Sequence, residues 1–423
     1  MKRKMIAIGA WCLAALPAFA QNRFPKPDFE SGYQYPTFDY PVPNELLWTS
    51  IDIFVLTAMM IFVSWAIVKR RNHTPAFIVS IISVLYFGFY RKGCVCSIGA
   101  IQNVVLSLTD SPYAMPISVF LVFILPIIFA LLIGRVFCAG VCPFGALQDL
   151  VNIKNYRLPK SLSAVLSILP WIYLILAILF ALTRSRFIIC RFDPFIGIFR
   201  MGGDMTMIAV GVVLLIISVF FGRPFCRFIC PYGALLSLFS RVAIHRIRIT
   251  PSCNNCDLCH NACPVDAIRP PYENKVKERR KEGVKRLLAY FVFLPIMALA
   301  GALLLRISSD TLSQVNKDIR LYEKVLDYEN RHVASMDMEI FLSQGGQIDE
   351  LKTRASSIRA EFKIGATVAG ACIGFIIAAT LIGLSIKRTR KTYEIDTAAC
   401  IACGRCFNYC PQNITHKNIQ QHG

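Results

Sequence analysis

Charged side chains are scarce in this chain: 17% of its 423 residues are charged, whereas 55% are hydrophobic. Apolar runs long enough to cross a hydrocarbon layer of about 30 Å recur along the sequence. This excludes an ordinary soluble domain and indicates an integral membrane protein. Acidic residues are also few, 26 against 46 lysines and arginines. Because membrane proteins hold such an excess in cytoplasmic loops, we do not interpret it as a nucleic-acid-binding surface.

Histidine is scarce as well, and its placement excludes a further class of protein. A haem held within the bilayer by two axial histidines needs both of them at membrane depth. No histidine falls inside an apolar run, so we expect no haem and no haem-dependent quinol dehydrogenase from this chain alone. The six histidines are His73, His245, His260, His332, His416 and His422.

Cysteine, by contrast, is frequent and regularly spaced. One run reads Cys253-Asn-Asn-Cys256-Asp-Leu-Cys259-His-Asn-Ala-Cys263-Pro264. In bacterial ferredoxins this spacing binds one [4Fe–4S] cluster through the close trio, while the fourth cysteine binds a second cluster. Zinc sites usually pair one CxxC with a distant CxxC or with histidines, so zinc explains the run poorly.

The same spacing returns near the C-terminus, in Cys400-Ile-Ala-Cys403-Gly-Arg-Cys406-Phe-Asn-Tyr-Cys410-Pro411. Two matching runs predict a two-cluster ferredoxin domain whose halves are separated in the sequence. The crossed ferredoxin pattern gives two ligand sets. They are Cys253, Cys256, Cys259 and Cys410 for one [4Fe–4S] cluster, and Cys400, Cys403, Cys406 and Cys263 for the other.

Two apolar runs lie between these halves, so the chain would leave the first half, cross the membrane, return, and complete the domain. With an outer N-terminus, the loops rich in lysine and arginine fall on the cytoplasmic side, as the positive-inside rule requires. Both ferredoxin runs are then cytoplasmic, in a compartment that protects thiols. The predicted spans are 50–68, 75–90, 115–134, 165–182, 207–222, 287–305 and 364–386.

The first residues have the pattern of a secretory signal peptide, with a basic start, an apolar run and Ala18-Phe19-Ala20. An uncleaved first helix is the alternative. The later polar stretch carries apolar residues at helical spacing, which predicts a helical hairpin on the outer face. This hairpin is either a connector or a docking platform for a redox partner. The apolar positions are Leu312, Val315, Ile319, Val325, Ile348, Leu351, Ile358 and Phe362.

The predicted fold is thus an α-helical polytopic membrane protein with about seven spans and a small α+β ferredoxin-like cytoplasmic domain. Its predicted location is the bacterial inner membrane. The predicted parts are a signal peptide (1–20), an extended outer arm (21–49), a five-span membrane domain (50–240), a first ferredoxin half (241–283), a transmembrane helix (284–306), an outer hairpin (307–363), a second transmembrane helix (364–386) and a second ferredoxin half (387–423).

An internal repeat marks the membrane part. Cys138-Ala-Gly-Val-Cys142-Pro-Phe-Gly-Ala-Leu-Gln matches Cys226-Arg-Phe-Ile-Cys230-Pro-Tyr-Gly-Ala-Leu-Leu. A weaker copy is Cys94-Val-Cys96-Ser-Ile-Gly-Ala-Ile-Gln, and a fainter one is Cys190-Arg-Phe-Asp-Pro-Phe-Ile-Gly-Ile. The predicted topology puts the two CxxxCP pairs at the inner membrane edge and the cysteines of the other copies at the outer face.

If each CxxxC segment is helical, its two thiols lie one turn apart on one face, and two such helices could present four sulfurs to a metal. Packing cysteines or tight turns before proline are the alternative. The candidates for a further metal or iron–sulfur centre are Cys138, Cys142, Cys226 and Cys230. The candidates for an outer-face site, or for a disulfide, are Cys94, Cys96 and Cys190.

The CxxxCP pairs, the CxxCxxCxxxCP runs and the stretch Arg390-Lys-Thr-Tyr-Glu-Ile-Asp-Thr-Ala-Ala-Cys together resemble the NosR/NapH family of membrane polyferredoxins. These proteins serve nitrous oxide reductase and periplasmic nitrate reductase. The resemblance covers residues 130–415, is nearest the NosR branch around Ile348-Asp-Glu-Leu, and implies electron transfer to a reductase system outside the cytoplasmic membrane. NosR-type proteins carry an outer flavin-binding domain that residues 21–49 cannot hold, so we expect no covalent flavin here.

We therefore predict a membrane-bound electron-transfer subunit with no catalytic residues of its own. Electrons from quinol or a cytoplasmic donor would pass between the cytoplasmic clusters and a periplasmic flavoprotein, cytochrome or nitrous oxide reductase system. The expected partners are membrane lipid and a hetero-oligomeric complex with such a protein, with quinone as a further candidate. The alternative function is a redox-sensing or maturation factor for an outer-face metalloenzyme.

Overall fold

The structure is a computed structural model. It describes residues 46–413, except residues 94, 110–112, 250–252, 274–279, 332–334, 344–345 and 387–388. The predicted signal peptide, almost all of the predicted outer arm and Cys94 lie outside the described residues.

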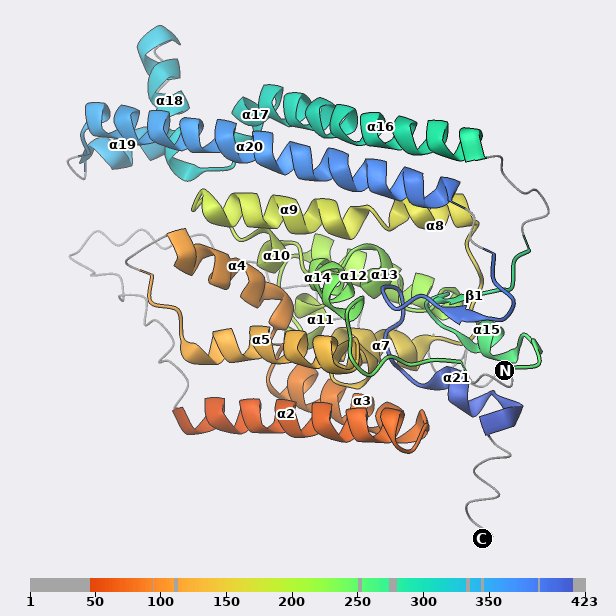
Figure 1. The fold of residues 1–423 in the computed structure, drawn as a ribbon. Helices are drawn as coiled ribbons and strands as arrows, with labels where there is room; N and C mark the ends of the chain where they lie inside the picture. The colour runs from red at the N-terminus through yellow and green to blue at the C-terminus, as the bar shows by residue number, and fades with distance from the viewer. Residues whose placement is uncertain are drawn as a thin grey trace. The chain divides into compact units, whose positions relative to one another are not determined.

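The described part of the chain is mainly helical (Figure 1). Before the first ferredoxin run the elements are α2 (Leu46–Val68), α3 (Thr74–Ser83), the π-helical η2 (Val84–Tyr90), α4 (Ser97–Thr109), α5 (Ile117–Leu132), α6 (Val136–Gly140), α7 (Pro143–Val151), α8 (Lys160–Leu166), α9 (Leu169–Leu182), α10 (Ile188–Arg191), α11 (Ile196–Arg200), α12 (Met205–Phe220), α13 (Pro224–Phe228) and α14 (Pro231–Ser240). After it come α15 (Leu258–Ala262), β1 (Ile268–Arg269), α16 (Arg280–Ile307), α17 (Ser309–Ser313), α18 (Lys317–Arg331), α19 (Met336–Ser343), α20 (Ile348–Ser385), β2 (Glu394–Ile395) and α21 (Arg405–Asn408).

Each predicted span coincides with one helix or with two consecutive helical elements, but their lengths differ. Four helical stretches of the described chain are long and apolar enough to cross a membrane: α2, α8 with α9, α16 and α20. The other three predicted spans correspond to α3 with η2, α5 and α12, which are shorter apolar helices. A helix of 16 residues rises about 24 Å, short of a hydrocarbon layer of about 30 Å. The apolar helix α4 was not among the predicted spans.

Helices approach one another closely around the first CxxxCP pair. A Cβ placed on Gly140 would lie 2.9 Å from a methyl carbon of Val63 in α2 and 3.1 Å from the carbonyl oxygen of Ala76 in α3. Only glycine therefore fits where α6 meets α2 and α3. Val63 and Ala76 are fully buried in the main hydrophobic core, which also contains Cys138 and Cys142.

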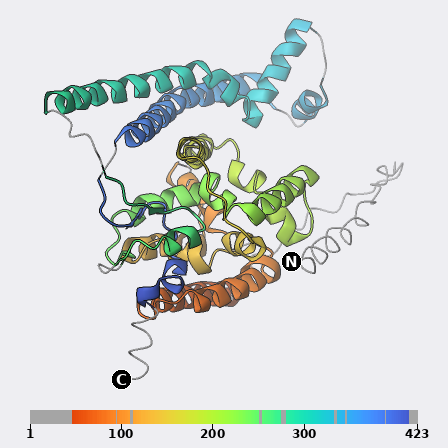
Figure 2. The same cartoon turned by 90° about the vertical axis from the view of Figure 1, so that its right-hand side faces the viewer.

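The two helices that separate the ferredoxin halves pack against each other through glycine. A Cβ on Gly370 in α20 would lie 2.2 Å from the carbonyl oxygen of Gly301 in α16, and one on Gly374 would lie 2.1 Å from that of Met297. Small residues that let backbones touch are typical of helix pairs in membranes. Figure 2 shows this pair along one side of the remaining helices, where α20 contacts α9 through Phe362 and Phe180.

The predicted outer hairpin is helical, but its second arm is not a separate element. It consists of α17, α18 and α19, and the returning arm is the first part of α20 itself. Val325, Met338 and Leu351 form a small hydrophobic core between α18, α19 and α20. Two residues from the predicted apolar pattern, Val325 and Leu351, are thus buried, with exposures of 2% and 4%.

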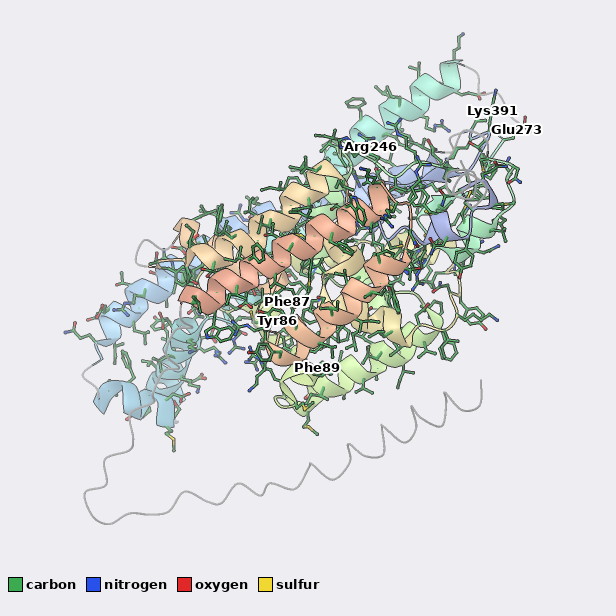
Figure 3. The ribbon with its side chains drawn as sticks, turned by 90° about the horizontal axis from the view of Figure 1, so that it is seen from below. Tyr86, Phe87, Phe89, Arg246, Glu273 and Lys391 are labelled. Carbon is green, nitrogen blue, oxygen red and sulfur yellow. The ribbon has the colours of Figure 1, made fainter. Side chains whose placement is uncertain are left out.

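A buried polar group lies within the helical part, beside η2. Asp52 in α2 pairs with Arg91 at 2.5 Å and accepts a hydrogen bond from the Tyr86 hydroxyl at 2.9 Å. Tyr86 is labelled with Phe87 and Phe89 in Figure 3, and all three belong to η2. The ion pair compensates a carboxylate that would otherwise be costly to bury.

The two ferredoxin segments join through backbone pairing. Strands β1 and β2 are antiparallel, with Ile268 opposite Ile395, and an isolated bridge joins Tyr272 to Arg390. The neighbouring Glu273 and Lys391 lie together in Figure 3. In Figures 1 and 3 these strands, α15 and α21 lie at one end of the long helices, whereas α18 and α19 lie at the other.

Candidate metal centres

The structure brings the first predicted ligand set together. Cys253, Cys256, Cys259 and Cys410 line one cavity, although Cys410 comes from the other ferredoxin half. Burial, reinforced by the negative charges of its three cysteine neighbours, raises the pKa of Cys259 to about 11. A thiol in this position stays protonated unless a bound cation stabilises the thiolate, so the set fits a site that binds iron and releases protons.

The second predicted set is also assembled from both halves. Cys400, Cys403, Cys406 and Cys263 lie within electrostatic range of one another. Burial raises the pKa of Cys400 to about 12. Backbone N–H groups point at these sulfurs, since Ala267 donates to Cys263 at 3.3 Å and Ala402 donates to Cys400 at 3.4 Å. Such donors stabilise a negatively charged thiolate.

Corresponding residues turn the chain in both runs. Asn255 and Asp257 have φ values of +58° and +64°, and the equivalent positions Ala402 and Gly404 have +54° and +72°. Asparagine, aspartate and glycine tolerate this left-handed conformation better than other residues. The turns curl each CxxC segment so that its N–H groups and sulfurs face inward, as in an anion-binding backbone concavity.

The two sets differ in exposure. Cys256 of the first set is exposed, whereas Cys403 of the second set is 8% exposed. Cys406 lies within electrostatic range of Cys259, so the two sets adjoin. The first set therefore lies on the solvent side of the second.

The second set is seated directly on the membrane helices. Arg135 donates to the carbonyl oxygen of Cys400 at 3.2 Å and also to that of Ala399. The His73 ring hydrogen-bonds to the carbonyl oxygen of Cys403 at 2.8 Å, and Ser240 donates to that of Thr397 at 3.1 Å. Backbone oxygens of the cluster loop are thus the acceptors for side chains that precede and follow the CxxxCP pairs.

The CxxxC segments are not single helices, and this corrects the prediction from spacing. Cys138 lies in α6, but Cys142 has an extended conformation with ψ 116° and caps α7. Likewise Cys226 lies in α13, and Cys230, with ψ 112°, caps α14. A residue before proline is forced out of the helical region, so the prolines that define the motif break the helix between its cysteines.

The four sulfurs nevertheless lie close together. Cys230 is within electrostatic range of Cys226, Cys138 and Cys142, and Cys142 is within range of Cys226 and Cys138. The Gln148 amide donates to the Cys226 sulfur at 3.4 Å. The broken helices thus bring four cysteines from two repeats into one neighbourhood.

Arg223 is the charged residue nearest to these cysteines that sequence reasoning missed. It is fully buried, pairs with Asp149, and donates to the carbonyl oxygens of Cys138 and Ala139. A sequence signal was available, because an arginine stands three residues before Cys138 and before Cys226. The first of these is Arg135, which binds the cluster loop.

Cys96, one of the predicted outer-face cysteines, lies near a CxxxCP cysteine. Cys96 is within electrostatic range of both Cys142 and Cys190. No three His, Cys, Asp or Glu side chains in the described ranges converge tightly enough for a single metal ion. The same is true of the two ferredoxin sets, whose cysteines do not converge on a single ion either. The ligands of an iron–sulfur cluster lie farther apart than those of a single ion.

Family models agree with the position of these cysteines. A model described as a 4Fe-4S binding domain matches residues 115–159 and 204–250, the two stretches that hold the CxxxCP pairs. A second 4Fe-4S binding domain model matches residues 393–414, which contain the second ferredoxin run.

Several curated proteins are similar to part of this chain. Regulatory protein NosR of Stutzerimonas stutzeri is 30% identical over 209 residues, covering 45% of this chain and 29% of the relative. Protein NirI of Paracoccus denitrificans is 29% identical over 237 residues, covering 52% of this chain and 35% of the relative. Ferredoxin-type protein NapH of Escherichia coli is 27% identical over 149 residues, covering 33% and 51%. The chain is a homologue of the NosR/NapH-type membrane polyferredoxins.

This NosR/NapH-like chain spans about a third of the length of NosR and NirI. No solved structure matches it. The resemblance predicted from the cysteine motifs is confirmed, as is the presence of 4Fe–4S-binding segments in a membrane-type protein.

Proposed function

We propose that this protein carries single electrons across the cytoplasmic membrane through a row of cysteine sites. The observation that supports it is the adjacency of the sites. The exposed first set adjoins the second set at Cys259 and Cys406, and the second set rests on the helices that carry the CxxxCP cysteines. Bound iron–sulfur clusters would supply one-electron oxidation and reduction at these positions.

The chain's own residues give each site its task. In the first set, Cys256 is exposed and would face a cytoplasmic donor or a quinol-oxidising partner. Between the second set and the CxxxCP cysteines, the positive charge of Arg223 stabilises added electrons because it lies within electrostatic range of Cys226 and Cys403. The buried ion pair with Asp149 holds this arginine in place.

The proposed orientation has the ferredoxin segments in the cytoplasm and the α18–α19 hairpin in the periplasm. Their positions at opposite ends of the long helices support it (Figure 1). We propose that the hairpin end meets an outer-face flavoprotein, cytochrome or nitrous oxide reductase system within a hetero-oligomeric complex.

A second candidate function is redox sensing or maturation of an outer-face metalloenzyme. Two relatives, from Stutzerimonas stutzeri and Pseudomonas aeruginosa, carry the name regulatory protein NosR. A sensor needs clusters that change redox state but does not need sustained electron flow through the membrane part. Turnover therefore separates the two functions.

Proteoliposomes test the proposed function. Protein purified without oxygen is inserted into vesicles that enclose a water-soluble one-electron acceptor, and a reductant that does not cross lipid is added outside. We expect reduction of the enclosed acceptor in vesicles whose ferredoxin end faces outward. The exposed cysteine of α20 provides a matched control, so Cys372→Ser should leave the rate unchanged. Clusters that are reduced while the acceptor stays oxidised would favour the sensing function.

A further inference from the structure

The four cysteine repeats of the membrane part are arranged as two equivalent pairs. In the pair of CxxxCP repeats, the Gln148 side chain accepts a hydrogen bond from the backbone N–H of Phe225 at 3.1 Å, one residue before Cys226. In the other pair, the Gln102 side chain accepts from the N–H of Ile189 at 2.9 Å, one residue before Cys190. Both glutamines stand six residues after a cysteine, so the same link joins the Cys138 repeat to the Cys226 repeat and the Cys96 repeat to the Cys190 repeat.

The sulfur environments correspond as well. The N–H of Gly233 donates to the Cys230 sulfur at 3.3 Å, and the N–H of Gly99 donates to the Cys96 sulfur at 3.4 Å. A Cβ placed on Gly99 would lie 3.2 Å from the Cys190 sulfur and 4.0 Å from that of Cys96. The two sulfurs therefore flank the same glycine, at the start of α4.

In the Cys190 repeat, Asp193 occupies the place of the second cysteine. It precedes Pro194 and Phe195 as Cys142 precedes Pro143 and Phe144, and its Oδ1 accepts N–H groups at the start of α11, from Phe195 at 3.0 Å and from Ile196 at 3.3 Å. It lies within electrostatic range of Cys96 and Cys190.

Two buried polar atoms at this place have no hydrogen-bond partner among the described residues. They are Oδ2 of Asp193, whose residue is 5% exposed, and Nε2 of Gln102, whose residue is 0% exposed. The equivalent Gln148 Nε2 donates to Cys226. An unpartnered buried carboxylate oxygen is costly, and Arg200, although within electrostatic range, does not hydrogen-bond to it. A bound cationic centre would satisfy the carboxylate, since oxygen and thiolate both ligate iron.

We propose that Cys96, Cys190 and Asp193 bind a second iron–sulfur centre in the membrane part, related by pseudo-symmetry to the site formed by Cys138, Cys142, Cys226 and Cys230. The centre differs from its counterpart by a carboxylate ligand. The proposal rests on the proposed function in one respect: the centre would add one more site to the row of cysteine sites that carries electrons. Inverted or repeated units that meet at a pseudo-symmetric interface commonly hold functional sites there.

Iron and sulfide analysis with EPR of the full-length protein, purified without oxygen, tests the proposal. Cys190→Ser and Asp193→Ala should each lower the iron content by the same amount, about two or four atoms per chain, and remove the same EPR signal. Asp193→Cys should keep the iron and change that signal, because a thiolate replaces the carboxylate. The ferredoxin signals serve as the folding control in every variant, and Cys372→Ser is the matched cysteine control.

Unchanged iron, sulfide and EPR in both Cys190→Ser and Asp193→Ala would overturn the proposal, as would a Cys96–Cys190 disulfide found by thiol counting in the parent protein. If Asp193→Ala fails to fold, Asp193→Asn and Asp193→Cys give the same comparison. The variant Cys138→Ser with Cys226→Ser should retain the signal of this centre. If this double variant loses electron flow but keeps the EPR signal of the centre at Cys96, Cys190 and Asp193, the proposed function and the proposed centre are tested separately.

Discussion

Arg223 and Asp149 form a buried ion pair, with Arg223 Nη2 2.5 Å from Asp149 Oδ2 and side-chain exposures of 0% and 2%. The same carboxylate lies 3.7 Å from Arg405, a residue of the second ferredoxin run. One aspartate thus faces both an arginine that binds the first CxxxCP segment and an arginine of the cluster loop. The pair connects two sites that lie far apart in the sequence.

Removing one partner of this pair should strongly destabilise the protein. Arg223→Met leaves a buried carboxylate that Arg405 compensates only in part, and we expect a loss of about 3–5 kcal/mol. Denaturant unfolding in detergent measures it. The exposed pair of Arg354 and Glu350 provides the control, because Arg354→Ala should cost less than about 1 kcal/mol. If both variants lost a similar free energy of unfolding, burial would not be what makes the Arg223–Asp149 pair important.

The crossed arrangement of the ferredoxin halves predicts which substitutions act together. Cys410→Ser should change the same EPR signal as Cys256→Ser, because both residues line one cavity although they belong to different runs. Cys263→Ser should instead change the signal affected by Cys403→Ser. If Cys410→Ser and Cys403→Ser altered one common signal, each run would hold its own cluster.

Docking of the second run should depend on His73. Its ring bonds to the carbonyl oxygen of Cys403 at 2.8 Å and accepts from Arg405 at 3.3 Å. His73→Phe removes both hydrogen bonds and leaves the carbonyl oxygen of Cys403 without this partner, which costs about 1–3 kcal/mol. We expect faster loss of iron to a chelator, from the second cluster before the first. His245 is exposed, and His245→Phe should leave the rate of loss unchanged.

The packing of α16 on α20 should fail with a single added methyl group. A Cβ on Gly370 would lie 2.2 Å from the carbonyl oxygen of Gly301, whereas one on Gly383 meets no atom within 4 Å. Gly370→Ala should therefore lower the Tm in detergent. Gly383→Ala should leave it unchanged or raise it, since alanine favours helices by about 1 kcal/mol. Equal Tm values would contradict direct backbone contact.

The sequence predicted the ferredoxin halves because their ligand spacing is dictated by cluster chemistry, and the structure brings Cys410 to the cysteines of the other run. It also predicted where the apolar helices lie, since hydrophobicity alone marks them. Hydrophobicity does not fix where a helix ends, so it did not show that α5 and α12 are shorter than a complete crossing. The helical prediction for the CxxxC segments was wrong because Pro143 and Pro231 force the preceding residue out of the helical region.

The connections between segments were beyond the sequence pattern. Asp149 and His73 look like ordinary helix or helix-end residues until the fold brings them to the cluster loop, whereas Arg223 shares with Arg135 its place three residues before a CxxxCP cysteine. Asp193 is different, because its place before proline in the Cys190 repeat can be seen in the sequence. Its role needed the hydrogen bond of Gln102 to Ile189, which only the fold supplies.

The most direct test of the account compares the parent protein with the double variant Cys138→Ser, Cys226→Ser, for iron content and for electron flow into vesicles. We expect the parent to hold more than the roughly eight irons of two [4Fe–4S] clusters. The variant should lose the irons of the CxxxCP site, keep both ferredoxin signals, and stop reducing the enclosed acceptor. Unchanged iron content together with unchanged electron flow would contradict the central claim that the CxxxCP cysteines carry electrons through the membrane.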